Sequence, residues 1–273
     1  MRRAILMRSA FAEQDELLAA KRHFDVIERR TQIQRGSLVI PRYSLLPFAA
    51  ELHADVECMG GQLINTLAQH QYVADLQAWY DDFADVTPAT WFHALDVEGQ
   101  GPFVIKGATN GRKHLWCTHM FAPTSRDILT VLCRLRADSS LSDQQIYVRQ
   151  YVELETFPGV LPLVYKLPVT QEWRFFLLDG EVLAYGFYWP EHYDEITTDL
   201  GIDLAPAGVA ALAFVQETIG PRLKDKVRFV VADVARDRDG RWLLVELNDG
   251  CMSGLSMVDP NTLYAALARG LAC

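Results

Sequence analysis

The residues best suited to chemistry gather in one stretch, residues 228–248, where two apolar runs flank the pair Asp239-Gly240. An Asp-Gly pair between such runs predicts a β-hairpin, and a two-residue turn there places Asp233 opposite Glu246. Because side chains alternate along a strand, Asn248 shares their face. Three oxygen-bearing side chains on one face suit a hard divalent cation that also binds nucleotide phosphates. The alternative is a surface hairpin whose polar face lies in water.

A second candidate group begins at Lys106, which ends an apolar run. Glycines in the loop after it would let backbone N–H groups turn toward an anion, and basic side chains would neutralise phosphate charge. The loop residues concerned are Gly107, Gly111, Arg112 and Lys113. Their spacing is not that of a Walker A motif. A solvated basic loop is the alternative interpretation.

A third candidate segment runs from Gln150 to Glu155. A strand edge offers N–H and C=O groups that copy base pairing, so the backbone of Gln150, Tyr151 and Val152 could bind an adenine ring. Either Glu153 or Glu155 could accept hydrogen bonds from ribose hydroxyls. An ordinary strand that leaves the core is the alternative.

Two arginines occupy positions where positive charge could assist a reaction. Arg174 lies in an aromatic hairpin on the same face as Glu172, so the two could simply form an ion pair. The alternative role for Arg174 is to stabilise a transferring phosphoryl group or a developing oxyanion, for which a planar guanidinium is suited. Arg42 follows a short strand, at the edge where open α/β sheets place ligand groups, unless it is only a surface arginine.

The composition is that of a well-packed soluble protein, since 50% of the 273 residues are hydrophobic and 22% are charged. A net charge of −9 and a pI near 5.3 argue against a general nucleic-acid or membrane-surface binder. The five cysteines are scattered without a Cys-x-x-Cys pair. We therefore expect reduced thiols, a cytoplasmic location and no zinc site. No apolar run is long enough to cross a membrane.

The elements that must position these residues change character along the chain. Residues 1–98 indicate a small α/β layer, in which apolar spacing predicts a helix over 13–28 and a strand over 37–40. The segment 98–102, with two glycines and a proline, is the best linker candidate. Beyond it, hairpins centred on Asp-Gly pairs predominate. We therefore expect a second domain over 99–273.

Taken in order, these groups resemble the ATP-grasp superfamily. The resemblance is carried by 103–113, 150–153, 172–174, Asp233 and 245–248. Further segments resemble its R2K clade, which takes its name from a retained arginine and two lysines. These segments are 39–48, 106–116 and 172–176. One departure is that residues 85–98 contain no lysine, whereas many ATP-grasp enzymes have one just before the first ATP-binding strands; Lys113 is the candidate substitute.

The resemblance covers nearly the whole chain and implies an α+β fold of the ATP-grasp type. In that fold, two α+β subdomains hold ATP behind a smaller N-terminal α/β layer. Residues 1–98 would form this N-terminal (pre-ATP-grasp) domain and residues 99–273 the ATP-grasp domain. Within the latter, 99–149 would be the first lobe and 150–273 the second lobe. ATP and Mg²⁺ would be the cofactors.

The family's motifs also imply roles for the nucleotide-binding residues. Lys106 would contact the ATP phosphates, and the loop 107–113 would close over them, with Lys113 as the second lysine of the clade. The backbone of residues 150–152 would bind adenine, and one of the two glutamates that follow would bind the ribose.

The same motifs imply a metal set and catalytic arginines. Asp233, Glu246 and Asn248 would hold one or two magnesium ions, in agreement with the hairpin register. Arg174 would face the γ-phosphate or an acyl-phosphate, and Arg42 is the second choice for the arginine of the clade. Together with Lys113, these arginines are the candidate catalytic residues.

The activity implied by the resemblance is an ATP-dependent ligase that joins a carboxylate to an amine, or to a thiol, through an acyl-phosphate. Its substrates would be small-molecule or peptide carboxylates and amines. Two alternatives are an ATP-grasp phosphotransferase, whose product stays phosphorylated, and a non-catalytic nucleotide-binding module. Neither a membrane nor a nucleic acid is an expected partner. The identity of the acid and the oligomeric state, a homodimer included, are left open.

Overall fold

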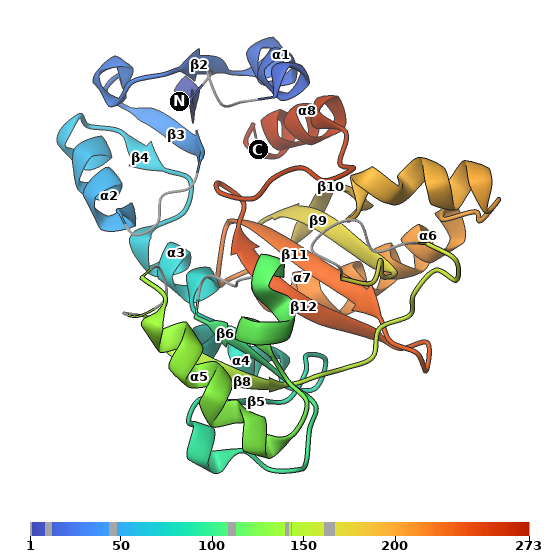
Figure 1. The fold of residues 1–273 in the computed structure, drawn as a ribbon. Coiled ribbons are helices and arrows are strands. Elements are labelled where there is room, and N and C mark those ends of the chain that lie inside the picture. The colour runs from blue at the N-terminus through green and yellow to red at the C-terminus, as the bar shows by residue number, and fades with distance from the viewer. Residues whose placement is uncertain are drawn as a thin grey trace.

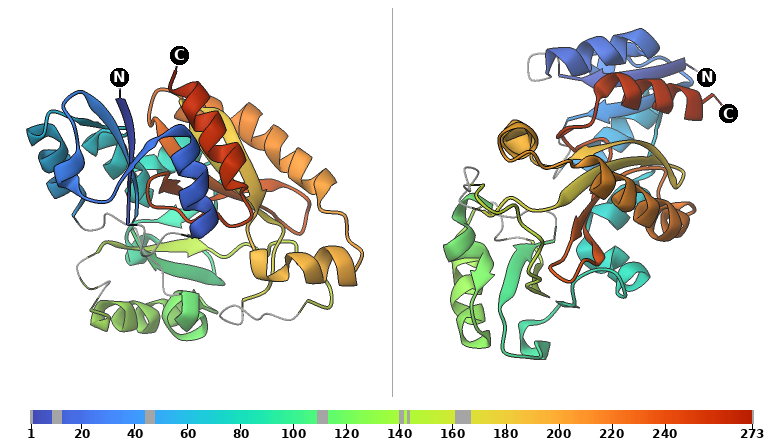
Figure 2. Two further views of the ribbon diagram at one scale, coloured as in Figure 1. Left: turned by 90° about the horizontal axis from the view of Figure 1, so that it is seen from above. Right: turned by 90° about the vertical axis from the view of Figure 1, so that its right-hand side faces the viewer.

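The computed structural model describes residues 2–8, 13–43, 48–108, 113–139, 142, 144–160 and 167–272. Their strands form three four-stranded sheets, which occupy separate parts of the molecule (Figure 1). In Figure 2 the N and C termini lie together at one end of the molecule, and the green segments of the second sheet lie at the other end.

The first sheet is parallel throughout, with the strand order β2-β1-β3-β4. Its strands are β1 (Arg2–Met7), β2 (Asp25–Ile27), β3 (Ser37–Arg42) and β4 (Gln62–Leu63). Helix α1 (Gln14–His23) connects β1 to β2, and helix α2 (Ala49–Cys58) connects β3 to β4. β1 and β3 are apolar along most of their length because both faces of this sheet are covered.

The helix predicted over residues 13–28 is wrong in its second half. α1 ends at His23, and Asp25–Ile27 pairs with β1 as a parallel strand. Val26 and Ile27 are β-branched and suit a pleated strand. Pairing with the sheet therefore overrides the helical spacing of the apolar residues.

The second sheet is antiparallel, with the strand order β5-β8-β6-β7. Its strands are β5 (Thr90–Trp91), β6 (Phe103–Gly107), β7 (Phe121–Ala122) and β8 (Ile146–Gln150). Helix α5 (Ile128–Ala137) covers one face and shares a buried apolar cluster with β6 and β8. Because β5 precedes the segment 98–102, this sheet uses residues from both sides of the predicted linker, and the division at residue 98 stays a prediction.

The third sheet is antiparallel, with the strand order β10-β9-β11-β12. Its strands are β9 (Glu172–Leu178), β10 (Glu181–Phe187), β11 (Phe229–Arg236) and β12 (Trp242–Asp249). Its helices are α6 (Ala205–Phe214), α7 (Gly220–Leu223) and α8 (Pro260–Gly270). Helices α3 (Leu67–Ala74) and α4 (Leu76–Phe83) also contact β12.

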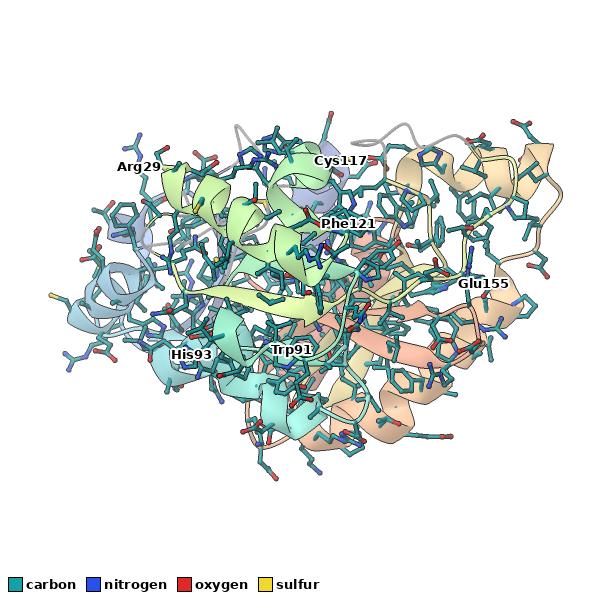
Figure 3. All side chains as sticks on the ribbon, turned by 60° about the horizontal axis from the view of Figure 1, so that its bottom comes forward. Arg29, Trp91, His93, Cys117, Phe121 and Glu155 are labelled. Atoms are coloured by element: carbon teal, nitrogen blue, oxygen red, sulfur yellow. The ribbon has the colours of Figure 1, made fainter. Side chains whose placement is uncertain are left out.

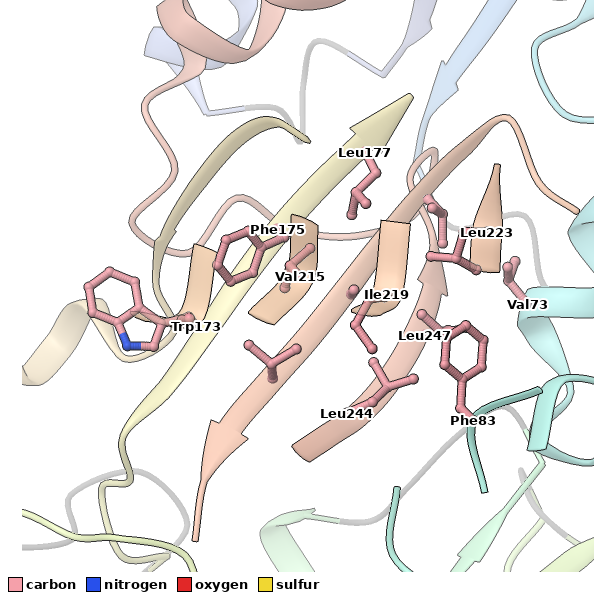
Figure 4. Packing of buried hydrophobic residues seen from close by; sticks show 14 of the residues in the cluster. Val73, Phe83, Trp173, Phe175, Leu177, Val215, Ile219, Leu223, Leu244 and Leu247 are labelled. Carbon is pink, nitrogen blue, oxygen red and sulfur yellow. The ribbon is translucent and has the colours of Figure 1, made fainter. Parts of the chain in front are cut away.

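Side chains alternate across the third sheet and build two separate cores. Trp173, Phe175 and Leu177 of β9 share a cluster with Val215 and other residues of the helical segment after α6 (Figure 4). Phe176 packs in a different cluster, with α8 and the first sheet. The even-numbered residues of β9 therefore lie on the face opposite the helices α6 and α7.

The β11–β12 hairpin confirms the predicted pairing of Asp233 with Glu246, although by a different route. The loop contains three residues rather than two, and it ends at Gly240, whose φ of 84° is left-handed. Such a loop shifts the register by one residue. A β-bulge at Val245 shifts it back, so that Asp233 and Glu246 meet after all.

Short helical turns complete the described elements. Those of 3-10 type are Arg30–Gln32, Ala94–Asp96, Lys113–Leu115, Ser125–Asp127 and Pro190–His192, and those of π type are Trp116–Met120, Glu195–Asp199 and Val215–Ile219. None of the helices in the described ranges is both long and apolar enough to span a bilayer.

Candidate functional site

A cleft of about 440 Å³ lies between the second and third sheets. Its walls come from β6, β8, β9 and β12, together with the short helical segment that follows Lys113. The residues singled out from the sequence that line it are Lys106, Gln150, Tyr151, Val152, Glu246 and Asn248. The fold thus brings the predicted base-binding, phosphate-binding and metal-binding segments to one cavity.

An ion pair crosses this cleft and joins the two sheets. Lys106 Nζ of β6 donates a hydrogen bond to Glu246 Oε1 of β12. The side chains are 13% and 25% exposed, so water screens this pair less than a pair on the open surface. The predicted phosphate-binding lysine and a predicted metal ligand therefore neutralise each other in this structure.

A second ion pair lies on the third sheet. Arg174 Nε and Nη2 donate to the two carboxylate oxygens of Asp233, each at 2.8 Å, from neighbouring positions of β9 and β11. Asn248 Nδ2 lies 3.5 Å from Asp233 Oδ2. The Asp233 side chain is only 2% exposed. The Glu172–Arg174 pair considered from the sequence is thus replaced by a two-point Arg174–Asp233 pair.

The surroundings of Arg174 hold it in the charged state. Burial disfavours the guanidinium charge, but the Asp233 carboxylate outweighs this and raises the pKa of Arg174. The guanidinium carbon also lies 4.8 Å from the ring centroid of Tyr188, a cation–π contact. Arg174 Nη1 donates to the carbonyl oxygen of Gly254 at 2.9 Å. Arg174 is therefore a fixed cation that is not part of the cleft wall itself but is linked to it through Asp233, whose neighbour Asn248 lines the cleft.

The predicted metal set consists of Asp233, Glu246 and Asn248, which are two carboxylates and one amide. Among the described residues, no group of three or more His, Cys, Asp or Glu side chains is arranged to hold a metal. The three oxygen-bearing side chains nevertheless lie at adjacent positions of one hairpin face. Oxygen donors of this kind suit Mg²⁺, which uses few protein ligands and completes its shell with water and phosphate.

Part of the cleft wall is aromatic. Trp116 and Tyr151 both line it, and their ring centroids are 6.5 Å apart. The N–H of Tyr151 donates to the Pro102 carbonyl, and the N–H of Gln150 to that of Ala89. Of the predicted adenine-binding segment, Val152 is the residue whose backbone makes no hydrogen bond to another described residue.

The two glutamates predicted for the ribose lie outside the residues that line the cleft. Glu153 forms an ion pair with Arg238, and Glu155, on the yellow segment that leaves β8 (Figure 3), lies 3.3 Å from Arg236. A different carboxylate, Glu172, lines the cleft and is only 6% exposed. Its place on the Arg174 face of β9 was readable from strand alternation, but the sequence interpretation treated it only as an ion-pair partner.

Arg149 is a buried cation of the cleft that the sequence interpretation missed. Its Nη1 donates to the Val245 carbonyl at 2.8 Å and its Nη2 to Thr87 Oγ1 at 2.7 Å, so it ties the second sheet to the third. Burial lowers the pKa of Arg149 to about 10, although the nearby Glu246 carboxylate opposes this shift. An arginine inside an apolar strand was the available signal.

Arg42 lies away from this cleft, at the end of β3. It forms a buried ion pair with Glu16 at 2.8 Å and donates to the carbonyl oxygens of Gly250 and Ser253. Burial disfavours its charge, but Tyr264 and Glu16 raise the pKa of Arg42 overall. Its contacts fix the segment that follows β12, and a direct part in catalysis stays a prediction.

The glycine-rich loop after Lys106 is described only at its ends. Gly107 is the last residue of β6, and Lys113 begins a short 3-10 turn. Gly111, Arg112 and the side chain of Lys113 lie outside the described part of the structure. Their predicted contacts with phosphate are therefore predictions still.

Three solved structures share this arrangement of sheets along nearly their whole length. D-cycloserine synthetase DcsG is 16% identical, with a TM-score of 0.57 over 98% of this chain and 99% of that one. A RimK domain ATP-grasp protein from Sphaerobacter thermophilus DSM 20745 is 14% identical, with a TM-score of 0.54 over 97% and 99%. The ATP-grasp ligase PsnB, in complex with a minimal precursor, is 11% identical, with a TM-score of 0.54 over 97% and 98%.

At these identities the likeness shows the fold, which is the ATP-grasp fold expected from the sequence. The family follows from the sequence itself: this chain belongs to family 3 of the R2K clade of ATP-grasp domains, whose model matches residues 94–267. A search of curated proteins finds no significant match to the sequence. One of these neighbours, PsnB, is described as an ATP-grasp ligase.

Proposed function

We propose that the protein is a Mg-ATP-dependent ligase that joins a carboxylate to an amine, or to a thiol, through an acyl-phosphate. The observation that carries this proposal is two ion pairs, Lys106–Glu246 in the cleft and Arg174–Asp233 beside it, whose carboxylates are paired across one hairpin. Two cations and two carboxylates at one place form a complementary set for a phosphate group and a divalent metal.

The proposed nucleotide lies along the cleft, with its base between Trp116 and Val152 and its phosphates at Lys106 and Arg174. Glu172 lies two residues from Arg174 on the same face of β9, about 7 Å along the strand. Glu172 also lines the cleft, whereas Glu153 and Glu155 do not. We therefore assign the ribose hydroxyls to Glu172, a carboxylate that can accept two hydrogen bonds.

The metal would be held by Asp233, Glu246 and Asn248, whose oxygen donors fit Mg²⁺. When bound, it would withdraw charge from the transferring phosphoryl group. The solved complex of PsnB with Mg and ADP shows that a protein of this fold binds both. The chain's own cations, Lys106 and Arg174, would orient the γ-phosphate and stabilise the negative charge on its oxygens.

The proposed reaction has two steps. A substrate carboxylate oxygen attacks the γ-phosphorus, the bond to the β–γ bridging oxygen breaks, and ADP leaves. An amine nitrogen then attacks the acyl carbon, inorganic phosphate leaves, and the nitrogen loses a proton. Both steps need positioned charges rather than a protein nucleophile. The basic groups and the partly apolar walls of the cleft suit that requirement.

The direct test is phosphate release from ATP with purified protein and a panel of carboxylates and amines, with products identified by mass spectrometry. Glu246→Ala should abolish turnover while circular dichroism and the melting temperature stay close to those of the wild type. Glu153→Ala is the matched control, because this carboxylate is exposed and paired outside the cleft. An active Glu246→Ala protein would contradict the proposal, and a phosphorylated rather than ligated product would identify a phosphotransferase.

A further inference from the structure

A second cavity, of about 400 Å³, opens where the first sheet meets the segment after β12. Arg8 follows β1 and Tyr43 follows β3, and both line it. Glu13 and Glu16, at the start of α1, form another side. Residues 251–255 form the wall toward the third sheet.

The strand order puts this cavity at the switch point of the first sheet. β1 and β3 are parallel neighbours, but the chain leaves β1 for β2 on one side and β3 for β4 on the other. The two connections therefore separate and leave a crevice outside the carboxyl ends of both strands. Open α/β sheets bind their ligands in such crevices.

The inner wall of the cavity is rigid and electrically balanced. The Arg42 side chain is 5% exposed and the Glu16 side chain 12%, and they neutralise each other. Arg42 also donates to the Ser253 carbonyl at 2.8 Å, and the Tyr264 hydroxyl donates to Glu16 Oε1 at 2.7 Å. These bonds fix the shape of the cavity and leave its buried part with no net charge.

The cavity is also lined by two side chains of opposite charge, Arg8 and Glu13. The guanidinium carbon of Arg8 lies 4.8 Å from the ring centroid of Tyr43, and stacking through its face leaves the N–H donors along its edge directed elsewhere. Glu13 is the residue that precedes α1, but its side chain makes no capping hydrogen bond to that helix. One cation and one anion in a single cavity complement a ligand that carries both an anion and a cation.

The cavity adjoins the proposed reaction centre through two of its lining residues. Gly254 lines it, and the Gly254 carbonyl accepts a hydrogen bond from Arg174 Nη1 at 2.9 Å. Met252 lines both this cavity and a small one whose walls include Lys106 and Glu246. A ligand held here is therefore next to the groups assigned to the γ-phosphate.

We propose that this cavity binds a compact zwitterion of the α-amino acid class as one of the two ligated substrates, an inference that rests on the proposed ligase function. Arg8 binds the α-carboxylate and Glu13 the α-ammonium group, which gives one proton to the Glu13 carboxylate before its nitrogen attacks the acyl carbon. The buried Arg42–Glu16 pair shapes the pocket without contributing net charge. The chain thus selects its acceptor by both charged ends of a small molecule.

The test measures binding by thermal shift and isothermal titration, with and without Mg²⁺ and the ATP analogue AMPPNP. The probes are the standard L-amino acids and their D-enantiomers, each compared with its N-acetyl derivative and its methyl ester. At least one free amino acid should bind, and blocking either end should weaken binding about 10- to 100-fold, because a hydrogen bond to a charged group is lost. Arg8→Gln and Glu13→Gln should produce losses of the same size.

Two matched variants separate this site from a general effect of charge. Arg2→Gln removes an arginine from the same strand, where it pairs with Asp25, and Asp15→Asn removes an acid from the same helix start. Both should leave amino-acid binding unchanged. Three results would overturn the inference. The protein could bind Mg-AMPPNP but none of the amino acids, it could bind the blocked derivatives as tightly as the free amino acids, or Arg8→Gln could bind the amino acid as tightly as the wild type does. Amino-acid binding without nucleotide binding would support this site and contradict the proposed ligase function.

Discussion

Replacing Glu246 with glutamine should strengthen the binding of metal-free ATP and reduce the increase in ATP affinity that Mg²⁺ causes. In the structure, Glu246 neutralises Lys106, and Asp233 neutralises Arg174. If the ATP phosphates bind to Lys106 and Arg174, the carboxylates of Glu246 and Asp233 lose their partners and lie beside the negatively charged triphosphate. Magnesium removes that conflict, because it gives the carboxylates a new partner. ATP and metal should therefore bind with positive coupling.

The size of this coupling follows from the Lys106–Glu246 pair. Two unit charges about 4 Å apart interact by about 4 kcal/mol at an effective dielectric constant near 20. The side chains are 13% and 25% exposed, so partial screening reduces this figure. A loss of about 1.5–3 kcal/mol, typical of a hydrogen bond to a charged group, is the better estimate. It corresponds to about a 10- to 100-fold change in affinity.

Isothermal titration of ATP in EDTA and in Mg²⁺ measures the coupling as a ratio of two dissociation constants. Glu246→Gln should bind ATP in EDTA more tightly than the wild type does. The dissociation constant in EDTA divided by that in Mg²⁺ should fall by about 10- to 100-fold. Glu153→Gln, whose carboxylate pairs with Arg238 outside the cleft, should change neither value. Weaker ATP binding by Glu246→Gln in EDTA, or an unchanged ratio, would refute the reasoning.

Glu172→Gln should reduce a preference for ATP over 2′-deoxy- and 3′-deoxy-ATP from about tenfold to near parity, because an amide accepts fewer hydroxyl protons than a carboxylate; a preference that persists in titrations would place the ribose elsewhere. Asp237→Asn should lower the free energy of unfolding by about 1–3 kcal/mol at pH 7, because the carboxylate accepts hydrogen bonds from Arg241 and Asp239. Burial alone would raise the pKa of Asp237, but these bonds lower it below 3.8. The difference in the free energy of unfolding between variant and wild type is therefore present above that pH and disappears as the pH falls through the lowered pKa. Urea titrations that give equal differences at pH 7 and pH 3 would contradict this. Gly186→Ala should destabilise by about 1–3 kcal/mol or more, since its Cβ would lie 2.3 Å from the Met257 carbonyl carbon, and a variant that unfolds at the urea concentration of the wild type would show that this segment yields.

Short-range rules predicted the pairing of Asp233 with Glu246 in the β11–β12 hairpin. Asp233 meets Glu246 although the turn has one residue more than predicted, because the bulge at Val245 compensates for it. Hairpin turns are readable from Asp-Gly pairs, whereas a bulge depends on packing of the whole sheet. The alternation that places Asn248 on the same face survives, because it begins beyond the bulge.

Long-range pairing was harder to predict from the chain alone. Glu153 and Glu155 directly follow the segment predicted to bind adenine, yet they do not line the cleft. They form ion pairs with Arg238 and Arg236, which belong to a hairpin distant in the sequence. Glu172 enters the cleft only because β9 packs beside β11. Such contacts depend on which strands become neighbours, and local residue patterns carry little information about that choice.

The measurement that tests the central claim most directly is a thermal-shift comparison of the protein with ATP, with Mg²⁺, and with both. A ligand that binds only the folded state raises the melting temperature. The proposed site predicts that Mg-ATP raises it more than either component, and that Asp233→Ala/Glu246→Ala protein loses this rise. No rise at ATP concentrations well above millimolar, or a full rise in the double variant, would contradict a Mg-ATP site in this cleft.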